Sequence, residues 1–158
     1  MIRVLLVDDR AAVRCGLRMR LALEQDVQVV GEAGNSGEAL VLAETFVPDV
    51  IVVDIEMPGV DAVRSIKQLR EAAPESAVVV LTMNGDKDNR ARAEEAGAHA
   101  FVEKQGGPEG LLQAIRRVVE PSLEPTGAGS NQGEEYRCTR DARRAAAVPS
   151  AMRRQSVG

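Results

Sequence analysis

The chain has 158 residues, of which 44% are hydrophobic and only 2% aromatic, so we expect about one domain with a core of aliphatic side chains. The formal net charge of −4 at pH 7 argues against a dedicated nucleic-acid-binding protein, which would carry a basic surface. The charge is uneven, because residues 121–158 hold six arginines against four acidic residues, and residues 1–120 therefore carry about −6.

The two cysteines, Cys15 and Cys138, lie in segments of very different character. This favours two free thiols in a reducing compartment over a disulfide framework. The apolar start of the chain is too short for a signal peptide, and no apolar run approaches the roughly 20 residues that span a membrane. We therefore expect a cytoplasmic protein with no membrane partner.

The chain opens with an apolar segment, residues 2–7, that has the composition of a buried strand. Residues 10–24 follow with an apolar side chain at every fourth position, which predicts a helix. Residues 27–30 predict a second strand, which we expect Gly31 to close.

Ser36 is expected to cap a helix that runs through Phe46 and is stopped by Pro48. Residues 50–53 are four consecutive β-branched residues, which is typical of a strand buried on both faces. Asp54 ends this third strand, because the proline that soon follows cannot donate to a sheet.

Residues 61–73 predict a helix, and residues 77–81 predict a fourth strand that Thr82 closes. Residues 86–96 are polar on nearly every side, which indicates a short exposed helix. Gly97 is a fitting C-terminal cap for it.

Residues 98–102 predict a fifth strand, and Pro108 opens a last helix that reaches Val119. Strands and helices thus alternate five times within residues 1–120. This pattern predicts one α/β domain with a doubly wound, five-stranded parallel sheet covered by helices on both faces. Residues 121–158 lack such periodicity and predict a disordered, arginine-containing tail, with a transient helix over residues 136–148.

Polar residues stand at the carboxyl ends of four of the five predicted strands. They are Asp8 and Asp9 after the first strand, Asp54 at the third, Thr82 at the fourth and Lys104 after the fifth. In a parallel sheet these ends lie on one edge, where such sheets bind their ligands. We therefore expect these side chains to converge.

Three carboxylates brought together repel one another unless a cation joins them, and oxygen ligands favour a hard ion such as Mg²⁺. A lysine and a hydroxyl beside a metal-bound carboxylate suit phosphoryl transfer to that carboxylate. The residues thus predict that Asp54 accepts phosphate.

This set of residues resembles the receiver domain of bacterial two-component response regulators, over about residues 2–120. The acidic pair Asp8-Asp9 matches the family's metal-binding acids, and Asp54, followed by Met57-Pro58-Gly59, matches its phosphoacceptor. Thr82 and Lys104 match its conserved hydroxyl and lysine, and Phe101 its switch aromatic. The opening of the chain, and the segment Val29-Val30-Gly31-Glu32-Ala33, look most like the subfamily that usually carries a LuxR-type helix-turn-helix. The residues after Glu120 are too few and too polar for that domain, so we do not expect nucleic-acid binding.

The resemblance implies a flavodoxin-like fold with strand order 2-1-3-4-5. It also implies Mg²⁺ or Mn²⁺ held by Asp8, Asp9, Asp54 and the backbone carbonyl of Glu56. A sensor histidine kinase would supply the phosphoryl group, Thr82 would move toward it, and Phe101 would rotate inward. Residues 86–119 would then bind a downstream protein or a second copy of the chain, and the protein would not be an enzyme beyond its own dephosphorylation.

Three other functions remain open from the sequence. The first is a receiver-fold interaction module that works without phosphate, since Gln105 stands where the family usually has proline and Glu56 adds another acid near the site. The second is a truncated DNA-binding regulator. The third is a haloacid-dehalogenase-like phosphatase, in which Asp54 is the nucleophile and Glu56 the general acid.

Two further residues have plain structural interpretations. His99, the only histidine, falls within the fifth predicted strand and has no evident partner acid, so we expect a structural role. Cys15 lies off the apolar face of its helix and is expected to be partly exposed.

Overall fold

The computed structural model describes residues 1–57, 59, 61–83, 85 and 87–119. The tail predicted to be disordered, residues 121–158, and the helix predicted within it lie outside these described residues. Among the described residues, no helix combines the length and the apolar character that crossing a membrane requires.

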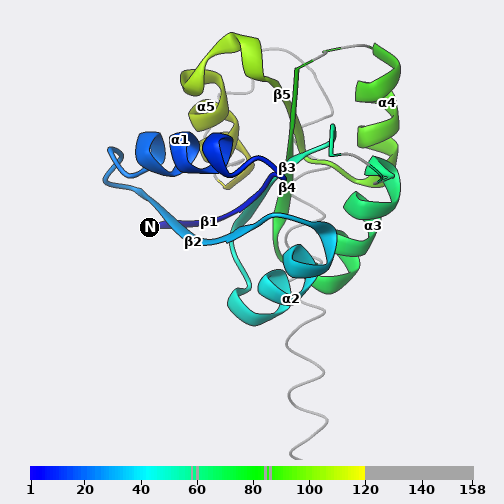
Figure 1. Ribbon diagram of the computed structural model, residues 1–158, viewed down its shortest axis with the longest axis horizontal. Helices are drawn as coiled ribbons and strands as arrows, with labels where there is room; N and C mark the ends of the chain where they lie inside the picture. The colour runs from blue at the N-terminus through cyan, green and yellow to red at the C-terminus, as the bar shows by residue number, and fades with distance from the viewer. Residues whose placement is uncertain (58, 60, 84, 86, 120–158) are drawn as a thin grey trace, which may run out of the picture. The chain divides into compact units, whose positions relative to one another are not determined.

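The domain is built on a five-stranded sheet in which every neighbouring pair of strands is parallel (Figure 1). The strand order β2-β1-β3-β4-β5 confirms the order that the resemblance implied. The strands are β1 (Ile2–Val7), β2 (Val27–Ala33), β3 (Val50–Asp54), β4 (Ala77–Thr82) and β5 (Ala100–Glu103). The central strands β3 and β4 are buried along their whole length, as their unbroken apolar sequences predict.

Helices cover both faces of the sheet, with α1 and α5 on one face and α2, α3 and α4 on the other (Figure 1). They are α1 (Ala11–Leu21), α2 (Ser36–Phe46), α3 (Ala62–Ala72), α4 (Lys87–Ala96) and α5 (Pro108–Val119), and a short 3₁₀ helix, η1 (Lys104–Gly106), precedes the last. The core has one part on each face. Ile66 and Leu69 of α3 help to build one part, and Leu111 and Ile115 of α5 the other.

The second strand is longer than predicted. Gly31 lies inside β2, where the register against β1 shifts: Val4 pairs with Val29, but Leu5 pairs with Gly31. A Cβ at Gly31 would approach Leu5 Cδ1 to 3.2 Å and the ring of Phe46 to 3.5 Å. The prediction that Gly31 closes the strand was therefore wrong, because this glycine serves a bulge and close packing.

The fifth strand begins two residues later than predicted. The backbone N–H of Ala98 still donates to the carbonyl of Ala93, and that of Gly97 donates to Glu94, which closes the end of α4. Gly97 adopts a left-handed backbone with φ of +107°, so its predicted role as a C-terminal cap is confirmed.

The start of α2 is capped by Asn35 and not by Ser36. The Asn35 side chain accepts a hydrogen bond from the backbone N–H of Glu38, and Ser36 is the first helical residue. The other end of α2 is unusual, because Val47 adopts a left-handed backbone with φ of 43°. A β-branched residue is strained there.

Candidate functional site

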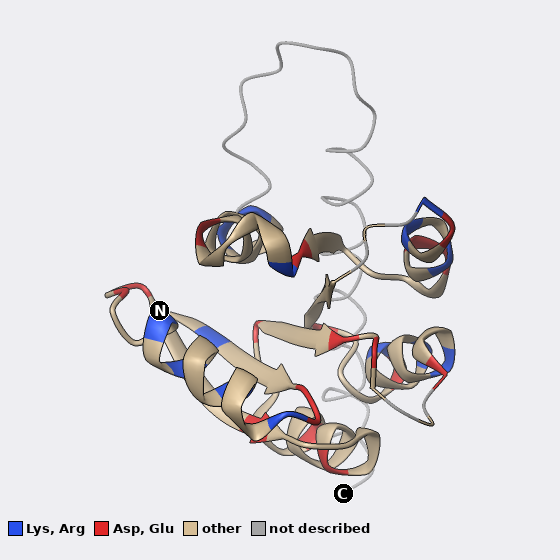
Figure 2. Cartoon of the chain, turned by 45° about the horizontal axis from the view of Figure 1, so that its top comes forward, with Lys and Arg blue, Asp and Glu red and all other residues tan. Residues whose placement is uncertain are grey.

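The polar residues at the strand ends come together at one edge of the sheet, as predicted. Asp54 is the last residue of β3 and pairs with Leu81, while Thr82 ends β4 and pairs with Glu103 of β5. Because all the strands run in parallel, their carboxyl ends share this edge. Figure 2 shows acidic residues, in red, at the carboxyl ends of strands.

Three carboxylates form a cluster suited to a cation. One oxygen from each of Asp8, Asp9 and Asp54 lies within 4.8 Å of the others. Asp8 and Asp54 are each only 2% exposed, whereas Asp9 is open to solvent. Burial raises the pKa of Asp8, and the neighbouring charge of Asp54 raises it further; the backbone N–H of Arg10 and the charge of Lys104 oppose this rise.

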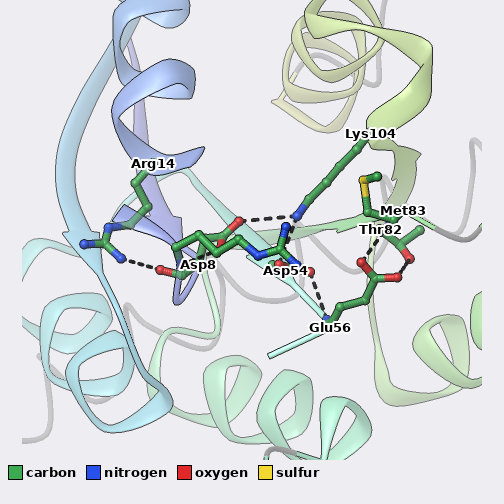
Figure 3. A network of polar contacts seen from close by, with 8 residues as sticks. Asp8, Arg14, Asp54, Glu56, Thr82, Met83 and Lys104 are labelled. Carbon is green, nitrogen blue, oxygen red and sulfur yellow. Dashed lines mark hydrogen bonds and ion pairs between the residues drawn. The ribbon is translucent and has the colours of Figure 1, made fainter. Parts of the chain in front are cut away.

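Lys104 reaches back over the cluster from η1. Its ammonium lies 3.0 Å from Asp54 Oδ2 and 3.4 Å from Asp8 Oδ2 (Figure 3). Burial acts to lower the pKa of Lys104, but its hydrogen bond to Asp54 and the charges of Asp54 and Asp8 outweigh burial and raise that pKa. The lysine is therefore held as a cation beside the buried aspartates.

Both oxygens of the Asp54 carboxylate are hydrogen-bonded. Oδ1 accepts from the backbone N–H of Glu56 at 2.9 Å, and Oδ2 accepts from Lys104. The first contact is a local turn in which an aspartate binds the chain two residues later. These contacts fix the orientation of the carboxylate at the end of a buried strand.

The side chain of Glu56 turns toward β4, which the sequence did not predict. Its Oε1 lies 3.3 Å from the hydroxyl oxygen of Thr82, and its Oε2 accepts from the backbone N–H of Met83 at 3.1 Å (Figure 3). Thr82 is fully buried. From sequence we expected the backbone carbonyl of Glu56 to bind the metal and its side chain to add an acid near the site, but nothing in the sequence indicated that the side chain would contact Thr82 and Met83.

Arg14 is a second residue near the site that the sequence analysis did not identify. Its guanidinium donates to the backbone carbonyl of Asp8 (Figure 3) and lies 3.7 Å from a carboxylate oxygen of Glu32 in β2. It thereby ties α1 to the ends of two strands. Arg14 lies about one turn into the helix that follows Asp8, and this spacing is a weak indication in the sequence that its side chain could reach the site.

Phe101 lies in β5 opposite Val80, three residues before Lys104. It is half-buried and packs against the core on the face covered by α2, α3 and α4. Its rotation on activation stays a prediction.

The structural interpretation of His99 is confirmed, although the residue precedes β5 and is not within it. Its ring Nδ1 accepts a hydrogen bond from the backbone N–H of Val78 at 3.0 Å. Cys15 is exposed on α1, more fully than predicted.

Comparison with known proteins places this arrangement in a family. A profile described as the response regulator receiver domain matches residues 4–116. The nitrate/nitrite response regulator protein NarL of Escherichia coli is 31% identical over 144 residues, covering 87% of this chain and 67% of that protein. The response regulator GacA of Pseudomonas aeruginosa is 38% identical over 118 residues, covering 75% of this chain and 55% of that protein. The chain thus spans between about half and two thirds of the length of these relatives.

Solved structures agree with the fold. The response regulator domain of CheB from Thermotoga maritima superimposes with a TM-score of 0.70 at 29% identity, covering 79% of this chain and 99% of that one. A two-component response regulator of the LuxR family from Aurantimonas gives a TM-score of 0.73, also at 29% identity, covering 87% and 99%.

Proposed function

Because the chain belongs to the family of response regulator receiver domains, we propose that it is the phosphoacceptor switch of a two-component system. A sensor histidine kinase supplies a phosphoryl group, and the Asp54 carboxylate accepts it. The observation that carries the proposal is the position of Asp54: a buried strand-end carboxylate whose oxygens are held by Lys104 and by a backbone N–H, on a strand paired with the one that ends at Thr82. The exposed thiol of Cys15 supports a reducing compartment such as the cytoplasm.

The acidic cluster fits a divalent cation. Its donors are all oxygens, and burial together with the charge of Asp54 raises the pKa of Asp8, a penalty that a bound cation removes. In the proposal Asp8, Asp9, Asp54 and the backbone carbonyl of Glu56 hold Mg²⁺ or Mn²⁺. When bound, the ion neutralises negative charge on the phosphoryl oxygens.

The residues of the chain divide the transfer between them. The P–N bond of the phosphohistidine breaks as a P–O bond forms to a carboxylate oxygen of Asp54. The imidazole leaves with the electron pair of the broken bond, as the neutral ring when its other nitrogen carries the proton. The Lys104 ammonium offsets charge on the phosphoryl oxygens, and the Thr82 hydroxyl donates to one of them.

The output is a shift between two conformations. Movement of Thr82 toward the phosphoryl group and inward rotation of Phe101 change the surface of residues 86–119, which then binds a downstream protein or a second copy of the chain. In this proposal the chain accepts and loses phosphate, and it turns over no separate substrate.

The test is the intact mass of the protein after incubation with acetyl phosphate, with Mg²⁺ or with EDTA. The variants are Asp54→Asn and, as a matched control, Asp61→Asn, since Asp61 caps α3 and asparagine caps helices equally well. We expect one phosphoryl group on the wild type and on the control, only with Mg²⁺, and none on Asp54→Asn. Equal phosphorylation of all three, or of none, would overturn the proposal.

A further inference from the structure

The carboxylate of Glu56 lies where a bound anion would lie. Its two oxygens each take one donor from the end of β4, the hydroxyl of Thr82 at 3.3 Å and the backbone N–H of Met83 at 3.1 Å. Both donors follow Leu81, the residue of β4 that pairs with Asp54, and one of them is the hydroxyl to which the proposed function assigns a phosphoryl oxygen. Figure 3 shows the Glu56 carboxylate directed at Thr82 and Met83, next to the Asp54 and Lys104 pair.

The backbone keeps Glu56 close to this position. Its N–H donates to Asp54 Oδ1 at 2.9 Å, so the residue is tied to the acceptor carboxylate itself. The side chain therefore starts within reach of the β4 donors whenever this turn is formed. A carboxylate held this way is a permanent, local competitor for those two donors.

A phosphoryl group on Asp54 and the Glu56 carboxylate cannot share these donors. Each is an anion, each needs the Thr82 hydroxyl, and two negative groups in contact repel unless a cation separates them. Hydrogen bonds to a charged acceptor are stronger than neutral ones, so displacing Glu56 has a real free-energy cost. Acceptance of phosphate must include that displacement.

We propose, building on the proposed function, that Glu56 is an internal occupant of the phosphoryl-oxygen site. In the unphosphorylated protein it accepts hydrogen bonds from Thr82 and Met83, and it must release Thr82 before that hydroxyl can bind the phosphoryl group. Glu56 thereby weakens binding of anions at Asp54 and slows phosphorylation. It also keeps the switch off until a donor drives the exchange.

The experiment titrates residues 1–158 of each protein with beryllium fluoride, which mimics the acyl phosphate, in the presence of Mg²⁺, and follows binding by calorimetry. The variants are Glu56→Ala, which removes both contacts, and Glu56→Gln, which keeps the shape but removes the charge. Glu103→Ala is the matched control, because it removes an equal charge from the same sheet edge. We expect Glu56→Ala to bind about tenfold more tightly than the wild type, Glu56→Gln to be intermediate, and Glu103→Ala to be unchanged.

A second readout does not depend on ligand. In ¹H–¹⁵N spectra without beryllium fluoride, the amide of Met83 should shift in Glu56→Ala, because it loses its carboxylate acceptor, and should stay in place in Glu103→Ala. Equal affinity of Glu56→Ala and Glu103→Ala, or an unmoved Met83 amide, would overturn this inference while leaving the proposed function intact. Failure of every protein, the wild type included, to bind would overturn both.

Discussion

Replacing Asp8 with Asn should stabilise the metal-free protein and remove its response to Mg²⁺. Asp8 is buried, and its carboxyl pKa is raised by burial and by Asp54, so its charged form is the unfavourable one in the fold. An amide keeps the acceptor for the backbone N–H of Arg10 but carries no charge. The variant thus loses a metal ligand but gains stability in the absence of metal.

The distances give the size of the effect. Two unit charges 4.8 Å apart, the outer limit within the cluster, interact by about 3.5 kcal/mol at an effective dielectric constant of 20. The ion pair between Lys104 and Asp8, at 3.4 Å, gives about 5 kcal/mol by the same arithmetic. Asp8→Asn loses the attraction to Lys104, and it also loses the repulsion by Asp54 and by the exposed, better screened Asp9. These two effects roughly cancel. What remains is the relieved cost of burying a charge, for which we expect a net gain of about 1–2 kcal/mol.

Thermal unfolding in EDTA and in Mg²⁺ measures this gain. In EDTA, Asp8→Asn should raise Tm by about 5 °C. Mg²⁺ should raise the Tm of the wild type, because an ion that binds only the folded state stabilises it, and should leave the variant nearly unchanged. Asp26→Asn is the control, because the pKa of Asp26 is shifted in the opposite direction: the hydrogen bond from Arg116 lowers it. This variant should not gain stability. A lower Tm for Asp8→Asn in EDTA, or a full response of that variant to Mg²⁺, would refute the reasoning.

The pH dependence of the stability difference tests whether the pKa of Asp8 is raised in the folded protein. A carboxyl whose pKa is raised in the folded state destabilises the fold when charged, and this penalty disappears as the pH falls through the raised pKa toward the ordinary value of 3.8. The advantage of Asp8→Asn over the wild type should therefore be largest near neutral pH and shrink on acidification. An advantage that grows as the pH falls would mean that the pKa of Asp8 is lowered in the fold.

Two predictions concern backbone conformation, and both are checked by urea unfolding. Val47→Gly should stabilise the protein by about 0.5–1 kcal/mol, because it relieves the left-handed backbone strain at the end of α2. Ala22→Gly is the control, because Ala22 has a right-handed backbone at the end of α1, and it should destabilise the protein by a similar amount. A loss of stability in Val47→Gly would contradict this prediction. Gly97→Ala should cost about 1–2 kcal/mol, because φ is positive there and the new Cβ would lie 2.7 Å from the guanidinium of Arg70. Gly16→Ala, inside α1 with open space around it, should instead gain about 0.5–1 kcal/mol, and equal effects of the two alanines would refute the argument.

The polar residues at the ends of β3 and β4 were predictable because each follows an unbroken apolar run that marks the strand. Asp54 follows four β-branched residues and precedes a proline, and in a parallel sheet this places it at the ligand-binding edge. The same argument predicted that Thr82 and Lys104, from distant parts of the chain, lie at the same edge of the sheet. Their convergence needed no knowledge of side-chain conformation.

The features that sequence missed depend on packing between distant elements. Gly31 is equally suited to a turn and to a bulge, and only the approach of Leu5 and Phe46 distinguishes the two. Similarly, the direction of the Glu56 side chain depends on the donors that β4 presents, and the contact of Arg14 with Asp8 depends on how α1 packs. Local sequence propensity cannot predict such contacts, because they depend on residues far away in the sequence.

Chemical trapping identifies the residue that accepts the phosphoryl group, which we propose to be Asp54. Borohydride reduces an aspartyl phosphate to homoserine, so peptide mass mapping of protein treated with acetyl phosphate and Mg²⁺ and then reduced identifies the modified residue. We expect homoserine at position 54 and nowhere else. Reduction at Asp8, Asp9 or Glu56 instead, with Asp54 unmodified, would contradict it.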